Sequence, residues 1–285
     1  YLSTTHFFSN TSSSLYLVMF FATLGMIIKP LKNISEQLLK INEIKGALTQ
    51  SIKILSEKSE LAQTKRSPIS LNTATFKKNA HIHSISCGFQ ETPIVHLNNL
   101  IVTPGKTITI TGPNGCGKST ILRTIAGLLT PITWSANINW IELSQQTTMI
   151  SQTPFLFNNS LLDNLIYGLP HHYSLTQTEI WQLLEKVHID TQIRNLPNKL
   201  QTNFKTLCLN FSGGQIQKLV LARSLLRKNN ILLLDEATSA IDPTSEYDIT
   251  LNLINEIKKQ NKSLITVTHR TDIINLYDDI ICLKN

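Results

Sequence analysis

Nine consecutive residues near the middle of the chain combine closely spaced glycines with a lysine and two hydroxyl side chains. They match the pattern GxxxxGK[ST], they follow the short run Lys106 to Ile110, and they precede a helical pattern that begins near Ile121. Glycines let backbone N–H groups surround phosphate oxygens, and the start of a helix adds a favourable dipole. The pattern therefore predicts a phosphate-binding loop made of Gly112, Pro113, Asn114, Gly115, Cys116, Gly117, Lys118, Ser119 and Thr120.

Two side chains of this loop carry distinct chemistry. Lys118 is expected to neutralise charge on the β- and γ-phosphates of a bound nucleotide, and the hydroxyl of Ser119 is expected to bind Mg²⁺. The alternative is a glycine-rich turn that binds nothing. The flanking strand and helix patterns disfavour that alternative, because they are the context that a phosphate loop requires.

A second group of functional residues follows the apolar run Ile231 to Leu234. Asp235 and Glu236 would then stand at the C-terminal end of a buried strand, where α/β sheets bind their ligands. Consecutive strand residues point to opposite sides, so Asp235 could bind Mg²⁺ while Glu236 accepts a proton from an attacking water. Asp235 could instead be a helix cap. The phosphate loop in the same chain favours the metal-binding role.

The elements that must position these residues are short apolar strands separated by helical patterns. The strands are expected at Lys106 to Ile110, Ile231 to Leu234 and Leu264 to Val267, which indicates an α/β domain. The polar stretch Ser56 to Ala80 contains Pro68 and loses helical periodicity, so it predicts a linker. The α/β domain is expected to begin near Leu71.

The N-terminal part has a different character. Leu15 to Ile28 carry no charge, and Lys29 and Lys32 follow, as at the cytoplasmic end of a membrane helix. This run is shorter than the roughly 20 apolar residues that usually cross a bilayer, so a buried helix of a soluble domain stays open on hydropathy alone. Between Ile34 and Leu55, apolar residues recur every three or four positions, which predicts a long amphipathic helix.

Charge and cysteine content narrow the possible partners. The formal net charge is +7, which suits an anionic partner such as nucleic acid, a membrane surface or a nucleotide. The basic residues are scattered and do not alternate with aromatics, so no nucleic-acid partner is expected. Cys87, Cys116, Cys208 and Cys282 are far apart without a CxxC pair, which indicates a reduced, cytosolic setting without structural zinc.

Phe211 to Gln215 (FSGGQ) resembles LSGGQ, the signature of the ABC ATPase family. The resemblance continues through Gln217 to Arg227, Asp235 with Glu236, Ser239 to Asp242, and Thr268 with His269, and it covers residues 71 to 285. It implies a P-loop NTPase of the ABC type: an α/β fold with a helical subdomain that binds ATP and Mg²⁺ and hydrolyses ATP.

The resemblance also implies roles for four residues outside the phosphate loop. Gln152 resembles the glutamine that contacts Mg²⁺ and the attacking water, and His269 resembles the switch histidine at the γ-phosphate. Asp242 resembles the family's loop aspartate that reaches across the dimer interface. Phe89 stands where the family usually has a tyrosine that stacks on adenine, although packing in the core is the alternative for this residue.

In this family two ATPase domains form a dimer with two ATP molecules between them. Ser212, Gly213, Gly214 and Gln215 of one subunit would close over the ATP that the other subunit holds. The catalytic set would be Glu236, His269, Gln152 and Lys118, and the magnesium ligands Ser119, Gln152 and Asp235. A second identical subunit is the simplest partner, since the catalytic set is complete.

The first residues resemble the end of the last membrane helix in exporters with a fused membrane domain, on the evidence of Ile28 to Leu31 and the amphipathic helix that follows. Residues 1–70 are therefore expected to be the end of a membrane domain with its linker, and residues 71–285 the ATPase domain. The chain would lie at a membrane, with the ATPase domain in the cytoplasm, and would drive export of an unidentified substrate.

Three features depart from the family pattern. The interval between Lys118 and Gln152 is short, which predicts an abbreviated antiparallel subdomain, and Thr202 to Cys208 lacks the usual loop that contacts the membrane domain. The chain begins at Tyr1 and ends at Asn285, where the family continues, so a fragment is expected. The alternatives are a soluble ABC-type ATPase that acts on nucleic acid or ribosomes, and a truncated relic that transports nothing.

Overall fold

The computed structural model of the protein describes Met19 and residues 79–89, 92–153, 155–169, 175–203, 205 and 211–283, without the side chain of Phe89. By its contacts the chain divides into Tyr1–Ser67 and Pro68–Asn285, and all described residues except Met19 belong to the second unit. Apart from Met19, the predicted membrane helix, the amphipathic helix and the boundary at residue 70 lie outside the described residues, as do nearly all of the linker and, within Thr202 to Cys208, residues 204 and 206–208. The linker was predicted to run through Ala80, but Ala80 already starts a strand.

A five-stranded parallel sheet forms the centre of this unit, in the order β5-β6-β7-β3-β8. Every neighbouring pair in it is parallel. Its middle strands are almost wholly buried, as expected of a sheet covered on both faces. The three strands expected from the sequence are all present, and the members of the sheet are β3 (Thr107–Thr111), β5 (Thr147–Ile150), β6 (Ile231–Asp235), β7 (Ser263–Val267) and β8 (Asp279–Cys282).

A smaller antiparallel sheet lies beside the phosphate loop, with the order β2-β1-β4. It consists of β1 (Ala80–Phe89), β2 (Thr92–Val102) and β4 (Thr133–Ala136). Between Lys118 and Gln152 the chain contributes only β4, four residues long, to this sheet. The short interval noted in the sequence is therefore occupied by α3 (Lys118–Ile125), β4, α4 (Trp140–Gln145) and β5.

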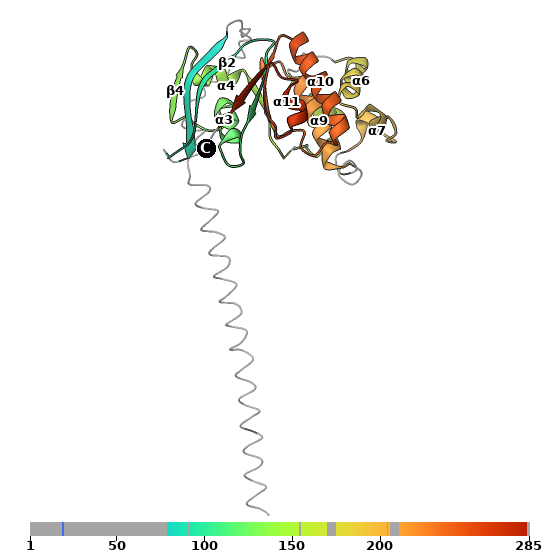
Figure 1. Cartoon of the computed structure of the whole chain (residues 1–285). Helices are drawn as coiled ribbons and strands as arrows, with labels where there is room; N and C mark the ends of the chain where they lie inside the picture. The colour runs from blue at the N-terminus through green and yellow to red at the C-terminus, as the bar shows by residue number, and fades with distance from the viewer. Residues whose placement is uncertain are drawn as a thin grey trace, which may run out of the picture. The chain divides into compact units, whose positions relative to one another are not determined.

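Helices cover the parallel sheet. The helices α6 and α7 lie at the end of the domain opposite to β2 and β4 (Figure 1). The helix α9 packs against α5, α6 and α10. The described helices are α3 (Lys118–Ile125), α4 (Trp140–Gln145), α5 (Leu161–Ile166), α6 (Gln177–Lys186), α7 (Asp190–Arg194), the 3₁₀ turn η1 (Lys199–Gln201), α9 (Gly213–Leu225), α10 (Pro243–Lys259) and α11 (Thr271–Ile274).

The two faces of β6 pack into two different hydrophobic cores. Leu232 and Leu234 join the core formed with α5, α6, α9 and α10. Ile231 and Leu233 join the core formed with the antiparallel sheet and α3. This alternation follows from the two-residue period of a strand. It fixes β6 from both sides and thereby fixes the carboxylates at its end.

The core on the helical side yields a stability prediction. Leu184 on α6 is 0% exposed, so Leu184→Ala should lower the free energy of unfolding by roughly 2–5 kcal/mol through lost burial and a cavity. Leu251 on α10 is 39% exposed, so the matched change Leu251→Ala should cost less than about 0.5 kcal/mol. Urea unfolding of the 285-residue chain measures both, and equal losses would contradict this assignment of the core.

Candidate functional site

The predicted phosphate loop lies between β3 and α3. Gly117 occupies the N-cap position of α3 with φ of 93°, in the left-handed region that favours glycine. A Cβ atom at Gly117 would lie 2.6 Å from Cγ1 of Val95 on β2. The loop thus approaches the antiparallel sheet so closely that only glycine fits, and α3 begins directly at Lys118.

Lys118 extends into the loop from the first turn of α3. Its Nζ donates to the backbone oxygens of Gly112 at 3.0 Å and Pro113 at 2.7 Å, and the residue is only 6% exposed. Carbonyl oxygens thus hold the ammonium group of this nearly buried residue inside the loop. This arrangement fits a phosphate group, as the sequence predicted.

Ser119 and Asp235, the expected magnesium ligands from distant parts of the chain, are in direct contact. The Ser119 hydroxyl donates to Oδ1 of Asp235 at 2.7 Å. Burial raises the pKa of Asp235, and the hydrogen bond from Ser119 and the charges of Arg123 and Lys118 partly offset that rise. A hydroxyl beside a carboxylate at the end of a strand is a donor set that suits Mg²⁺ next to phosphates. The residues present therefore fit the expected ion.

Glu236 brings together two further predicted residues. Its Oε2 accepts a hydrogen bond from Nε2 of Gln152 at 2.9 Å, and its Oε1 lies 3.0 Å from Nε2 of His269. Glu236 has φ of 49°, which turns the chain sharply after β6. Asp235 and Glu236 thus contact different partners, as expected for consecutive residues at a strand end. Gln152 contacts Glu236 and makes no described contact with Asp235.

These residues come from the ends of three neighbouring strands. Gln152 follows β5, Glu236 follows β6, and His269 follows β7, and these strands are adjacent in the sheet. The carboxyl ends of parallel strands share one edge of a sheet, where α/β proteins bind ligands. The phosphate loop follows β3, the next strand in the same sheet.

The signature residues lie at the start of α9. Ser212 is the N-cap, and its capping box with Gln215 pairs Gln215 N with Ser212 Oγ at 3.3 Å and Ser212 N with Gln215 Oε1 at 2.8 Å. A Cβ atom at Gly214 would lie 2.4 Å from the backbone oxygen of Ala240, whereas Gly213 has more room, with Ala240 Cβ at 3.9 Å. Among the described residues, the signature residues thus contact α9 and the turn 236–242 that contains Ala240 (the Ala240 turn). These contacts do not include the phosphate loop of the same chain.

Asp242 and Phe89, two further residues with predicted roles, lie at the ends of regular elements. Asp242 caps α10, where its Oδ1 accepts hydrogen bonds from Ser245 N and Thr244 Oγ1, both at 2.9 Å. The bond from the Ser245 backbone, followed by those from the Ser245 and Thr244 side chains, lowers its pKa to about 2. Phe89 is the last residue of β1, and its stacking on the adenine of ATP stays a prediction.

Gln217 begins the range Gln217 to Arg227 that resembles the family, but the sequence assigned it no role. Its Oε1 accepts from the backbone N of Ala240 at 2.9 Å, and its Nε2 donates to Ser239 Oγ at 3.4 Å. Gln217 is 4% exposed, although it is polar and lies in a largely apolar helix. A buried amide among apolar neighbours was the signal, since such groups are retained when they are hydrogen-bonded. It ties α9 to the turn that follows Glu236.

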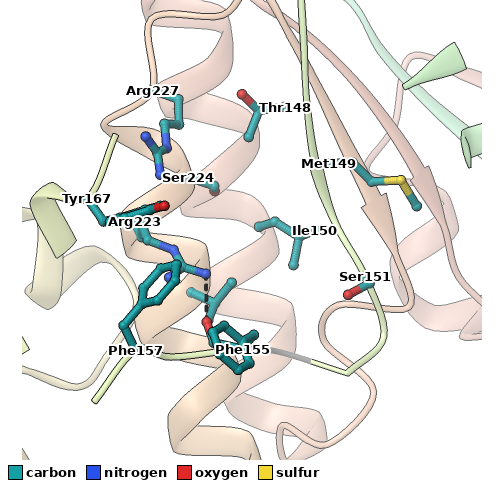
Figure 2. A pocket seen from close by; sticks show the side chains of 11 residues that line it. Thr148, Met149, Ile150, Ser151, Phe155, Phe157, Tyr167, Arg223, Ser224 and Arg227 are labelled. Carbon is teal, nitrogen blue, oxygen red and sulfur yellow. Dashed lines mark hydrogen bonds between the residues drawn. The ribbon is translucent and has the colours of Figure 1, made fainter. Parts of the chain in front are cut away.

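A cavity of about 270 Å³ lies between β5 and α9, with Ser151 among the residues that line it (Figure 2). Arg223 closes one side, and its Nη2 donates to the backbone oxygen of Phe155 at 2.9 Å. Burial lowers the pKa of Arg223 and of Arg227. Phe155 is 66% exposed and Tyr167 is 53% exposed, so the rim of the cavity is aromatic and accessible.

Comparison with known proteins agrees with this geometry. Residues 95–239, half of the chain, match the ABC transporter family. The chain is 31% identical over 276 residues to the ATP-dependent lipid A-core flippase of Desulfotalea psychrophila. The aligned region covers 93% of this chain and 47% of the flippase. The chain is 35% identical over 205 residues to mouse ATP-binding cassette sub-family B member 5, which covers 68% of the chain and 16% of that protein.

A solved structure shares the fold. A bacterial Atm1-family ABC exporter with ATP bound superposes with a TM-score of 0.66 at 24% identity, over 86% of this chain and 44% of the exporter. The chain thus spans less than half the length of these relatives.

The fold and the site together define a P-loop ATPase. The chain belongs to the ABC transporter family, as the match over residues 95–239 shows, and the family, fold and ATPase class predicted from the sequence are confirmed. None of the helices in the described part of the chain has the length and hydropathy of a membrane span.

The phosphate loop supplies a matched pair of glycine variants. Gly117→Ala and Gly115→Ala both place a side chain at positive φ, 93° and 81°, which costs roughly 1–2 kcal/mol in either case. Only Gly117→Ala also collides with Val95, because a Cβ atom at Gly115 meets nothing within 4 Å. Gly117→Ala should therefore be the more destabilising change in thermal unfolding.

The collision has its own test. In a double-mutant cycle, Val95→Ala should recover part of the loss caused by Gly117→Ala, because it removes the Cγ1 methyl that the new Cβ meets at 2.6 Å, while the Val95 Cβ at 2.7 Å stays. Val95→Ala should not improve the stability of Gly115→Ala. Additive losses in both pairs would refute the close approach of β2 to the loop.

Proposed function

We propose that the chain is the ATP-hydrolysing part of an ABC exporter, working as a dimer that drives transport of a substrate across a membrane. The observation that carries this proposal is the convergence at one sheet edge: Glu236 meets Gln152 and His269, while Asp235 meets Ser119 at the start of α3. An acid with two orienting partners beside a phosphate loop suits the attack of water on a phosphoryl group.

Each residue has a part in this mechanism. The glycine-rich loop and Lys118 bind the phosphates, and Ser119, Asp235 and Gln152 would hold Mg²⁺, which when bound neutralises phosphate charge. Glu236 accepts the proton from the attacking water. Gln152 contacts one carboxylate oxygen of Glu236 and His269 contacts the other, so the two residues together fix the orientation of the general base during the reaction at the γ-phosphate.

The second half of each site would come from another subunit. Ser212, Gly213, Gly214 and Gln215 contact α9 and the Ala240 turn rather than the phosphate loop of their own chain, which is consistent with action on the ATP of a partner. Ser212 is exposed at the N-terminus of α9, and the dipole of this helix would there favour the γ-phosphate of the partner's ATP. Asp242 and Phe89 would complete the composite site, through the dimer contact and stacking on adenine respectively.

Membrane transport is inferred from relatives. The flippase named above acts on lipid A core, and the superposed structure is an exporter, so a membrane location with the ATPase domain in the cytoplasm is the natural inference for this chain. The uncharged run Leu15 to Ile28 with its flanking lysines is consistent with it. The cargo is not inferred from these names.

The direct test of the function is ATP hydrolysis by the 285-residue chain and its Glu236→Gln variant. The variant should bind ATP as tightly as the unchanged chain but hydrolyse it at least about 100-fold more slowly, because an amide cannot accept the proton. Lys118→Ala is the control that should lose binding itself. Near-normal turnover by Glu236→Gln would show that Glu236 is not the general base.

The dimer is tested by mixing two differently inactivated chains. Lys118→Ala leaves phosphate charge uncompensated, and Gly214→Asp places a carboxylate at the signature and also crowds Ala240. Each variant alone should therefore fail to form dimers when ATP is added. In the mixed dimer one site combines an intact loop with an intact signature. ATP-dependent association, measured by light scattering, should therefore reappear in the mixture.

The controls for this experiment are folding and pairing. Circular dichroism must show both variants folded, and a mixture of Lys118→Ala with unchanged chain sets the signal for one intact site. If the mixture of the two variants associates no better than either alone, the action of the signature on a partner's ATP is refuted and a monomeric ATPase is the better description.

A further inference from the structure

A buried carboxylate lies just outside the catalytic cluster. Glu246 is on the first turn of α10 and is 1% exposed. A carboxylate removed from water to this extent carries a large desolvation penalty unless charged and hydrogen-bonded partners offset it. The partners of Glu246 therefore show which parts of the chain it holds together.

Its two oxygens reach two different loops. The Thr238 hydroxyl donates a hydrogen bond to Oε1, and Nη1 of Arg270 forms an ion pair with Oε2 at 2.7 Å. Thr238 lies in the turn that follows Glu236, and Arg270 directly follows His269. One buried side chain thus connects the segments that carry the two partners of the 3.0 Å contact between Glu236 and His269.

Arg270 is also held from its other side. Its Nε and Nη2 donate to the two carboxylate oxygens of Asp272 at 3.1 and 2.6 Å, and its backbone N donates to Thr268 Oγ1 at 3.1 Å. The guanidinium is a planar group with donors in fixed directions, so the hydrogen bonds to Asp272 define its orientation. The contact with Glu246 on the other side is an ion pair without hydrogen-bond geometry, and it adds attraction between opposite charges. Because Arg270 is bonded to His269 along the backbone, its orientation limits where the imidazole can lie.

We propose that Glu246 is a positioning residue that holds His269 against Glu236 by binding Arg270 and Thr238 at once. The role of this contact in hydrolysis rests on the proposed function of Glu236. Glu246 does not touch the reacting groups itself. It acts through the backbone of the turn 236–242 and of the segment 268–272, and a displacement of about 1 Å in such a contact lowers turnover strongly.

The test compares two glutamates of α10. Glu246→Gln keeps the size of the side chain and loses the charge that binds Arg270. Glu256→Gln makes the same change at an ion pair of similar length, 2.6 Å to Lys186, that involves neither Thr238 nor Arg270. Thermal unfolding of the full chain reports the stability cost of each, and hydrogen exchange reports local mobility of the segment 268–272.

Two measurements carry the expected result. Amide exchange in 268–272 should rise in Glu246→Gln and stay unchanged in Glu256→Gln. Turnover should fall roughly 10- to 100-fold in Glu246→Gln with little change in ATP affinity. In a His269→Ala background, the same substitution should cause almost no additional loss, because the residue that Glu246 positions is already absent.

The outcomes separate this proposal from the proposed function. If the unchanged chain hydrolyses no ATP, the proposed function fails, and the exchange experiment still decides whether Glu246 orders the segment after His269. Unchanged exchange in Glu246→Gln, or a loss of turnover that adds fully to that of His269→Ala, would overturn the positioning role.

Discussion

The parallel pairing of β6 with β5 on one side and β7 on the other is the constraint on which the site depends. Gln152, Glu236 and His269 follow these three strands, and they meet only because Ile150 pairs with Leu234 and Asp235 with Val267. A shift of either neighbour by one residue would turn its side chains to the opposite face and separate the partners of Glu236. The two hydrophobic cores on either face of β6 maintain this register.

The charged groups at this edge are held by polar and charged groups of the protein. Lys118 is held by carbonyl oxygens, Asp235 by the Ser119 hydroxyl and Glu246 by Arg270 and Thr238. Each buried charge would destabilise the fold if its partner were lost, which links the integrity of the site to the stability of the domain. The same link makes substitutions that preserve size, such as glutamate to glutamine, the informative ones.

The sequence was sufficient to predict the parts of this site that depend on local pattern. Short apolar runs predicted β3, β6 and β7, and the glycine spacing predicted the loop, because strand burial and phosphate binding each demand particular residue types at fixed positions. The family resemblance singled out Gln152 and His269, for roles at Mg²⁺ and at the γ-phosphate, but their contacts with Glu236 were not predicted, since no local pattern relates residues so distant in the chain.

Glu246 shows why the rest was not predicted. An acidic residue in the first turn of a helix is common on an exposed surface, where it complements the helix dipole. The informative feature was its place in the 3.6-residue period: Glu246 shares the buried face of α10 with Ile249, Leu253 and Ile257. Its partners, however, lie in loops whose positions depend on the tertiary fold, so the sequence could mark the residue as unusual without identifying what it binds.

The same reasoning explains the contacts of α9. Gly214 approaches the backbone of Ala240, and Gln217 binds the N–H of Ala240, so the helix that carries the signature is attached to the turn following Glu236. In the proposed dimer, Ser212 would contact the ATP of the partner while Glu236 acts on the ATP of its own chain. A displacement of Ser212 is then transmitted through one packed glycine and one buried amide to the general base. Two sites connected by such short, buried contacts are expected to respond to each other's nucleotide, because a rigid element cannot move at one end alone.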